Sequence, residues 1–182
     1  MTKGMKKKVY NILFGLAIVV VAYLLNEAGI ITNKDDLTET NSLKDTTKYT
    51  VTRVVDGDTI VLSQGEDSFK VRLIGVDTPE SVHPNKEKNT EFGEIASNYT
   101  KEKLLNKEVT LELDVQETDK YGRTLAYVYI DGVMFNKMLL QSGMAKIATY
   151  PPNVKYVEEF KVLEKQAREN KAGLWSDEYS SN

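Results

Sequence analysis

The sequence has 182 residues, of which 41% are hydrophobic and 28% are charged, a composition typical of one globular domain with a short appendage. It contains no cysteine and one histidine, which excludes disulfide scaffolds, thiolate metal sites and sites that need two histidine ligands. The net charge of −3 excludes a globally basic nucleic-acid-binding surface and leaves a local basic patch open. The chemistry of any site must come from carboxylates, Arg, Lys, Tyr, Ser or Thr, and such oxygen ligands suit a hard cation.

The N-terminal segment 1–25 has the pattern of an export signal or a membrane anchor. Four lysines among the first eight residues precede the nearly unbroken apolar run Ile12–Leu25. We expect an uncleaved anchor slightly more than cleavage and secretion, and both alternatives export the remainder of the chain. Residues 26–47 are polar without a regular apolar period, which predicts a flexible linker before the folded domain 48–176 and a tail over 177–182.

Five short strands are predicted in the folded domain. The first three cover 49–55, 60–62 and 69–76, and Asp56-Gly57-Asp58 between the first two is typical of a hairpin turn. The segment 109–115 alternates strictly between apolar and polar residues, which predicts a half-buried strand, and the fifth strand covers 125–130.

Three helices are predicted from apolar residues at helical spacing. The first contains Phe92 and Tyr99 and has Asn89 or Thr90 as its N-cap. A short second helix begins near Phe135 and stops at Gly143, and a third runs from Val157 to near residue 170. The order of three strands, a helix, two strands and two helices predicts an α+β fold, a five-stranded Greek-key barrel of the OB type with three helices.

Two motifs far apart in the chain contain the candidate catalytic residues. One is the hairpin turn with Asp58, and the other runs from Arg72 through Asp77 to Glu80. If the second and third strands pair, Asp58 and Asp77 converge at one end of the sheet. Two carboxylates and a backbone carbonyl form a hard-cation site that keeps bound waters. A second arginine, Arg123, precedes the fifth strand.

Four segments of the folded domain carry a recognisable pattern: VVDGDTIVL (54–62), VRLIGVDTPE (71–80), TDKYGRTLAYVYIDG (118–132) and GLW (173–175). In their order and spacing the chain resembles, over roughly 49–176, the staphylococcal nuclease family, the calcium-dependent thermonucleases. The resemblance implies an OB-fold phosphodiesterase that cleaves the 5′ P–O bond of DNA and RNA, with single-stranded or frayed regions favoured, and leaves 3′-phosphates. It also implies a set of ligands and catalytic residues: Ca²⁺ bound by the side chains of Asp58 and Asp77 and the carbonyl of Thr78, Glu80 as the general base, and Arg72 and Arg123 on the scissile phosphate.

The resemblance further implies substrate contacts outside the reacting centre. Lys120 and Tyr121 match residues that contact the phosphate of a bound nucleotide. The family usually has two tyrosines, spaced by two, after the second helix, whereas this chain has only Tyr150 in a segment one residue shorter. We therefore expect weaker base stacking at this position, by about 1–3 kcal/mol for each lost base–aromatic contact.

Two other functions are compatible with the sequence. The first is a non-catalytic module on the same barrel that binds nucleic acid or protein, since fold does not fix function. The second is a structural cell-surface protein tethered by the N-terminal segment, which would leave the cluster of acids and arginines unexplained. All five proposed catalytic and metal-binding side chains are present, which favours the enzyme, and we expect a monomer.

Overall fold

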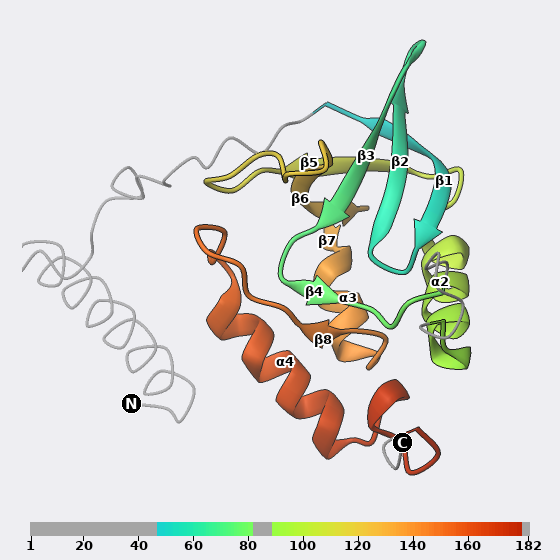
Figure 1. Cartoon of the computed structure of the whole chain (residues 1–182), viewed down its shortest axis with the longest axis vertical. Coiled ribbons are helices and arrows are strands. Elements are labelled where there is room, and N and C mark those ends of the chain that lie inside the picture. The colour runs from blue at the N-terminus through green and yellow to red at the C-terminus, as the bar shows by residue number, and fades with distance from the viewer. Residues whose placement is uncertain (1–46, 82–88, 180–182) are drawn as a thin grey trace, which may run out of the picture. The chain divides into compact units, whose positions relative to one another are not determined.

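The computed structural model describes residues 47–81 and 89–179 (Figure 1). The predicted signal or anchor over 1–25 and nearly all of the predicted linker over 26–47 lie outside these residues. None of the helices in the described part of the chain combines the length and the apolar character that crossing a membrane requires.

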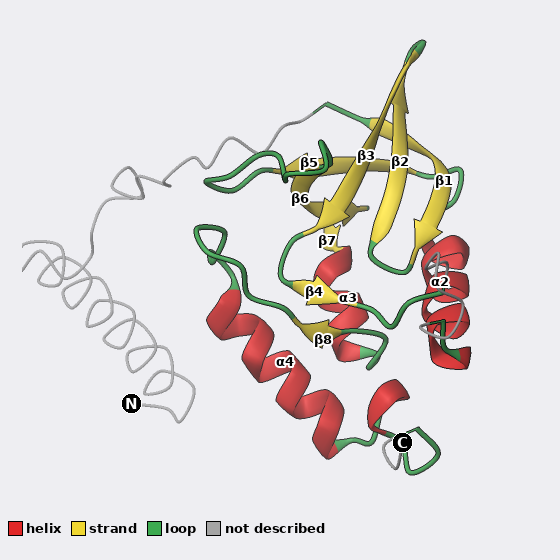
Figure 2. Ribbon diagram, in the orientation of Figure 1, coloured by secondary structure: helices red, strands yellow, loops and turns green. Residues whose placement is uncertain are grey.

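The strands and helices follow the predicted order (Figure 2). The five main strands are β1 (Tyr49–Asp56), β2 (Thr59–Gln64), β3 (Asp67–Leu73), β5 (Glu108–Glu112) and β6 (Thr124–Ile130). Three strands of two residues were not predicted: β4 (Val76–Asp77), β7 (Val133–Met134) and β8 (Lys146–Ile147). The helices are α2 (Glu91–Leu104), α3 (Phe135–Gln141), α4 (Val157–Glu169) and the 3₁₀ turn η2 (Gly173–Trp175).

The five main strands close into a barrel, which confirms the predicted fold class. The hairpins β1–β2 and β2–β3 are antiparallel, β5 pairs with both β1 and β6, and the parallel pairing of β3 with β6 completes the circle. The parallel seam joins Val71 to Thr124 and Arg72 to Leu125. Figure 1 shows α3 below the barrel and α4 farther out, next to β8. The seam brings two segments that are far apart in the chain to the same rim of the barrel.

The barrel interior contains the residues of alternating strand positions. Val51, Ile60, Leu62, Val71 and Val128 are fully buried, as the period of two in a half-buried strand requires. Helix α3 closes one end of the barrel with an apolar side that is equally buried, made of Phe135, Leu139 and Leu140. The strands can therefore hold polar residues on their outer face and at the rim.

The helix ends form where the sequence predicts them. Thr90, one of the two predicted N-caps, accepts a hydrogen bond from the Gly93 N–H at 2.9 Å. Gly143 follows the end of α3 with a φ of +68°, a left-handed conformation that glycine adopts without a steric cost.

Two predicted strands are longer than the observed ones. The predicted strand 69–76 is interrupted after Leu73, because Gly75 has a φ of +79° and turns the chain before β4. The predicted strand 109–115 ends at Glu112, because the Asp114 carboxylate accepts hydrogen bonds from the Val115 N–H at 2.9 Å and from the Tyr127 hydroxyl at 2.9 Å. The 113–115 segment consequently leaves the sheet, and Val115 is 74% exposed.

A buried carboxylate connects β5 to the start of α4. Glu112 is 2% exposed and accepts hydrogen bonds from the hydroxyls of Tyr129 at 2.6 Å and Tyr156 at 2.8 Å. It also pairs with the Lys155 ammonium at 2.7 Å. Burial alone would raise the pKa of the Glu112 carboxyl, but these hydrogen bonds outweigh burial and hold that pKa below its ordinary value.

We expect Glu112→Gln to lower the free energy of unfolding by about 1.5–3 kcal/mol near neutral pH, because charged hydrogen bonds are lost. A carboxyl whose pKa is lowered by folding stabilises the protein above its unfolded-state pKa, about 4.3 for Glu, and this stabilisation is lost as the pH falls through the folded-state pKa. Urea unfolding of the parent and the variant at several pH values should therefore show a difference that shrinks below about pH 4.

The matched control is Glu117→Gln, since Glu117 is exposed. It should cost little at any pH. A Glu112→Gln difference that is constant from neutral to acidic pH would show that the carboxylate charge does not stabilise this network.

Candidate active site

The structure brings Asp58 and Asp77 together, as the predicted strand pairing requires. Thr59 next to Asp58 pairs with Arg72 in the β2–β3 ladder. The Arg72 Nη2 lies 3.1 Å from the Asp58 Oδ2 and 2.9 Å from the Asp77 Oδ1. Thr78 donates its backbone N–H at 2.8 Å and its hydroxyl at 3.1 Å to the same Asp58 oxygen. The two predicted motifs therefore form one cluster at the barrel rim.

The close approach of the two motifs depends on Gly57. A Cβ at this position would lie 2.8 Å from the Thr78 side chain, so only glycine allows the hairpin turn to reach the 76–81 segment. The buried Thr100 of α2 donates its hydroxyl to the Gly57 carbonyl at 2.7 Å. Asp56 accepts the Ser81 hydroxyl at 2.7 Å. The Asp-Gly-Asp turn is thus fixed from two sides, and its first aspartate is a positioning residue that the sequence analysis treated only as part of the turn.

Glu80 is held against the N-terminus of α2 by its main chain. The Thr90 N–H donates to the Glu80 carbonyl at 2.9 Å. A Cβ at Gly93 would lie 2.1 Å from that same carbonyl oxygen, so the first turn of α2 needs glycine there. The exposed Glu80 side chain lines a cavity of about 210 Å³ whose wall also contains Asp58, Asp77, Arg72 and Arg123. This cavity brings together five of the predicted site residues.

Arg123 is oriented by a carboxylate within its own turn. The Asp119 Oδ2 accepts the Arg123 Nε–H at 2.7 Å, and the Asp119 Oδ1 accepts the backbone N–H groups of Arg123 and Tyr121. Burial alone would raise the pKa of the Asp119 carboxyl, but the hydrogen bonds from Arg123 and Tyr121 outweigh burial and lower it. Asp119 was not singled out from the sequence, because a spacing of four residues indicates such a pair on a helix and residues 119–123 form a turn.

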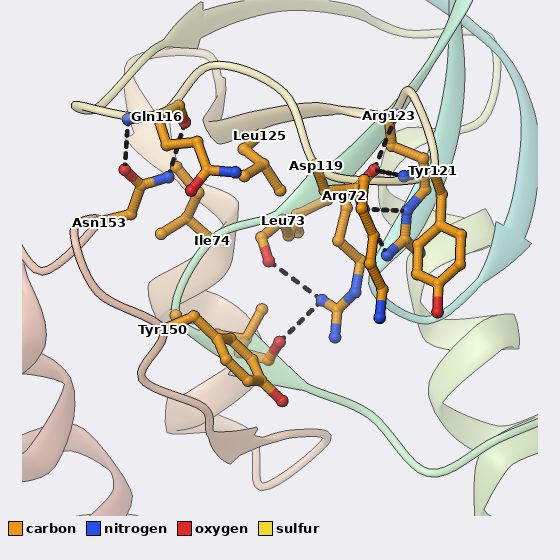
Figure 3. A pocket seen from close by; sticks show the side chains of 13 residues that line it. Arg72, Leu73, Ile74, Gln116, Asp119, Tyr121, Arg123, Leu125, Tyr150 and Asn153 are labelled. Atoms are coloured by element: carbon orange, nitrogen blue, oxygen red, sulfur yellow. Dashed lines mark hydrogen bonds and ion pairs between the residues drawn. The ribbon is translucent and has the colours of Figure 1, made fainter.

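The predicted substrate-binding residues line a second, larger cavity of about 480 Å³ (Figure 3). Lys120, Tyr121 and Tyr150 form part of its wall. Both tyrosines are 71% exposed, and in Figure 3 they lie on opposite sides of Arg72. The Lys120 ammonium lies 5.0 Å from the centre of the Tyr121 ring. Exposed aromatic rings beside cations are surfaces on which a nucleotide can stack.

The two cavities share a wall formed by Arg72 and Arg123. The Arg72 Nη1 donates to the carbonyls of Leu73 at 3.0 Å and Val76 at 2.8 Å, which fixes its guanidinium in one orientation. An anion at the junction of the cavities would contact both guanidinium groups, which match the bidentate geometry of phosphate.

The wall that contains Tyr150 is fixed by a buried asparagine that the sequence analysis did not identify. Asn153 is 5% exposed, accepts the Gln116 N–H at 2.7 Å and donates to the Gln116 carbonyl at 2.8 Å. This reciprocal pair connects the 148–156 segment to the 113–118 segment. A lone Asn after two prolines is typical of a turn, and no pattern in the sequence predicted that it would be buried.

The chemistry of the oxygen donors fits a hard cation. Burial raises the pKa of the Asp58 carboxyl above its ordinary value, and the nearby Arg72 charge and the Thr78 N–H compensate this only in part. A dication would stabilise the ionised form of Asp58 further. Within the described residues no three His, Cys, Asp or Glu side chains are close enough to hold a metal by themselves. A cation bound by Asp58 and Asp77 would therefore also need the Thr78 carbonyl and water.

The fold and the site together define a class of protein, the small OB-type barrels whose rim presents arginines and carboxylates. Residues 70–177 match the family model described as staphylococcal nuclease homologue. The chain belongs to the staphylococcal nuclease family, which confirms the resemblance inferred from the four sequence motifs.

Three relatives show how far this similarity extends. The chain is 42% identical over 164 residues to the thermonuclease of Staphylococcus hyicus, and the matched region covers 90% of this chain and 96% of that protein. It is 46% identical over 127 residues to the thermonuclease of Staphylococcus intermedius, covering 70% and 75% of the two chains. It is also 37% identical over 153 residues to endonuclease YncB of Bacillus subtilis (strain 168), covering 83% and 72%.

Proposed function

We propose that this chain is a Ca²⁺-dependent nuclease that hydrolyses DNA and RNA at the 5′ P–O bond and leaves 3′-phosphates. The observation that carries the proposal is the junction of the two cavities. Arg72 and Arg123 line both of them, Glu80 lies in the smaller one, and Tyr121 and Tyr150 lie in the larger one. A phosphodiester at the junction would have a candidate base on one side and stacking surfaces for its nucleoside on the other.

The proposed reaction gives each of these groups a role. Glu80 takes a proton from a water whose oxygen forms a bond to phosphorus, and the bond from phosphorus to the 5′-oxygen breaks. The 5′-oxygen leaves and takes up a proton from solvent. Negative charge builds on the equatorial phosphate oxygens, where the two fixed guanidinium groups stabilise it. A bound Ca²⁺, held by Asp58, Asp77 and the Thr78 carbonyl, would supply further positive charge to the phosphate.

Each supporting residue has a part in this arrangement. Asp119 orients the guanidinium of Arg123, and the carbonyls of Leu73 and Val76 orient that of Arg72. Among the described residues that line the smaller cavity, the groups that can accept a proton from water are carboxylates, and Glu80 is the candidate base. Lys120 and Tyr121 would contact a nucleotide phosphate on the side of the larger cavity.

We also propose export, either tethered to the outer face of a bacterial membrane or secreted. The support comes from the sequence alone, from the lysines at positions 3–8 and the apolar run Ile12–Leu25. Protease treatment of intact cells that produce the chain tests export, because an exported domain is digested without breaking the membrane. A single copy carries all of the site residues, so the proposed function requires only a monomer.

The nuclease proposal predicts that the full-length chain shortens heat-denatured DNA when Ca²⁺ is present and that an excess of chelator stops it. The length of the strands on a denaturing gel is the measurement. Binding of DNA without cleavage would instead support the non-catalytic module. Cleavage that continues in chelator would contradict the assignment of Asp58, Asp77 and Thr78 as ligands of a required cation.

A further inference from the structure

Lys70 is a further cation at the site to which the proposed reaction assigns no part. It lies on β3 two residues before Arg72, so both side chains leave the same side of the strand. It lines the smaller cavity together with Glu80 and Arg123. Its side chain is exposed and forms no hydrogen bond or ion pair within the described residues. In contrast, Arg72 and Arg123 are each paired with a carboxylate.

Arg53 continues the same row across the outer face of the barrel. Val61 on β2 is paired with Lys70 on one side and with Arg53 of β1 on the other. Directly paired residues of antiparallel strands point to the same face of a sheet, and adjacent strands lie about 4.8 Å apart. Arg53 is exposed and, among the described residues, has no ion-pair partner. The two charges therefore form a basic row that begins at the smaller cavity and runs away from it.

The positions of the two cavities determine on which side of the scissile phosphate this basic row lies. A scissile phosphate between Arg72 and Arg123 has its stacked nucleoside in the larger cavity, with Tyr121 and Tyr150. The nucleic acid on the other side of the cleaved bond must then leave through the smaller cavity. Lys70 is part of the wall of that cavity, and Arg53 lies beyond it on the sheet.

We propose that Lys70 and Arg53 bind the phosphates next to the scissile one, on the side of the substrate that points away from Tyr121 and Tyr150. The substrate class is then a polynucleotide that extends past the cleaved bond over β3, β2 and β1, rather than a dinucleotide. This inference rests on the proposed function for the position of the scissile phosphate. It also explains how a chain with a net charge of −3 can bind a polyanion, because two positive charges without an ion-pair partner among the described residues lie beside the reacting centre.

The test compares Lys70→Ala and Arg53→Ala with Lys107→Ala in the full-length chain. Lys107 is also exposed and has no side-chain partner within the described residues, but it precedes β5 and lines neither cavity. The substrates are a dinucleotide with one phosphodiester and a single-stranded oligodeoxynucleotide long enough to reach from the larger cavity across β1. Binding of the fluorescent oligodeoxynucleotide is measured separately in chelator, at several salt concentrations, so that it does not depend on turnover.

We expect Lys70→Ala to raise the KM for the oligodeoxynucleotide by about three- to tenfold, and the ratio of its kcat/KM to that of the dinucleotide to fall by a similar factor. The slope of log Kd against log salt should become shallower by about 0.7 for each lost phosphate contact. Arg53→Ala should change the slope by the same amount with a smaller effect on KM. Lys70→Arg should restore the slope, and Lys107→Ala should match the parent in both measurements.

Three results would overturn the inference, and each is distinct from a failure of the proposed function. Equal losses on the dinucleotide and the oligodeoxynucleotide would place Lys70 at the scissile phosphate. An unchanged salt slope in Lys70→Ala would show that its ammonium contacts no phosphate. A change of the same size in Lys107→Ala would show a general charge effect. If the parent chain cleaves neither substrate, the proposed function fails, but the binding measurement still decides whether the basic row binds phosphates.

Discussion

Glu80→Gln should lower kcat for DNA cleavage by about 10²–10⁴-fold, the usual contribution of a general base. The amide cannot accept a proton from water, but it has nearly the same size and keeps the hydrogen bond that the Thr90 N–H donates to the Glu80 carbonyl. The affinity for a nucleotide should change little, because Glu80 lines only the smaller cavity and Tyr121 and Tyr150 line the larger one. Single-turnover rates and equilibrium nucleotide binding are the measurements.

Glu66→Gln is the control for this substitution. Glu66 is exposed in the turn between β2 and β3 and lines neither cavity, so its loss should leave the rate unchanged. A Glu80→Gln enzyme that turns over within a few-fold of the parent would remove Glu80 from the mechanism. Water would then have to be activated by another group of the smaller cavity.

Arg72→Lys should lower kcat/KM by about 10²–10³-fold, the cost of losing one preorganised donor to developing negative charge. A lysine keeps the positive charge but has no planar fork. The fork holds the Leu73 and Val76 carbonyls through one nitrogen and Asp77 through the other. The rate should therefore fall even though the positive charge at position 72 is kept. Steady-state kinetics gives the effect, and urea unfolding separates it from a change in stability.

Arg168→Lys provides the comparison, because Arg168 stacks on Trp175 at 3.6 Å and lies on α4 away from both cavities. It should alter stability without altering the rate per folded molecule. If Arg72→Lys retained most of the parent rate, a positive charge alone would suffice for catalysis at this position. The proposal that Arg72 binds the phosphate through two donors would then be wrong.

Local signals in the sequence were sufficient to predict the five main strands, the three helices and the convergence of the acids. Thr90 caps α2 because a threonine before an amphipathic segment is a strong N-terminal signal. Asp58 and Asp77 converge because the short turn at Gly65 and Glu66 makes β2 pair with β3 in one register. Lys70 could have been found in the same way, since a strand that alternates places it on the side of Arg72.

Features that depend on contacts between distant segments could not be predicted. Position 93 requires glycine because α2 lies against the main chain of Glu80, and nothing in the sequence around position 93 indicates that contact. The premature end of β5 arises from a hydrogen bond between Asp114 and Tyr127, which lie 13 residues apart. Asn153 is buried because it pairs with Gln116, 37 residues earlier. These contacts hold the segments around the site in place, and patterns of residue type do not encode them.

The parallel seam between β3 and β6 has a thermodynamic consequence for the whole barrel. Val71 and Thr124 are paired across it; Lys70 precedes Val71 on β3, and Arg123 directly precedes Thr124, the first residue of β6. The seam closes the circle of strands, so the barrel opens if it separates. A phosphate held by both Arg72 and Arg123 would bridge the two strands, and its binding energy would be added to the energy of closure. Bound substrate would thus stabilise the closed barrel, and amides along this seam would exchange with solvent more slowly when the site is filled.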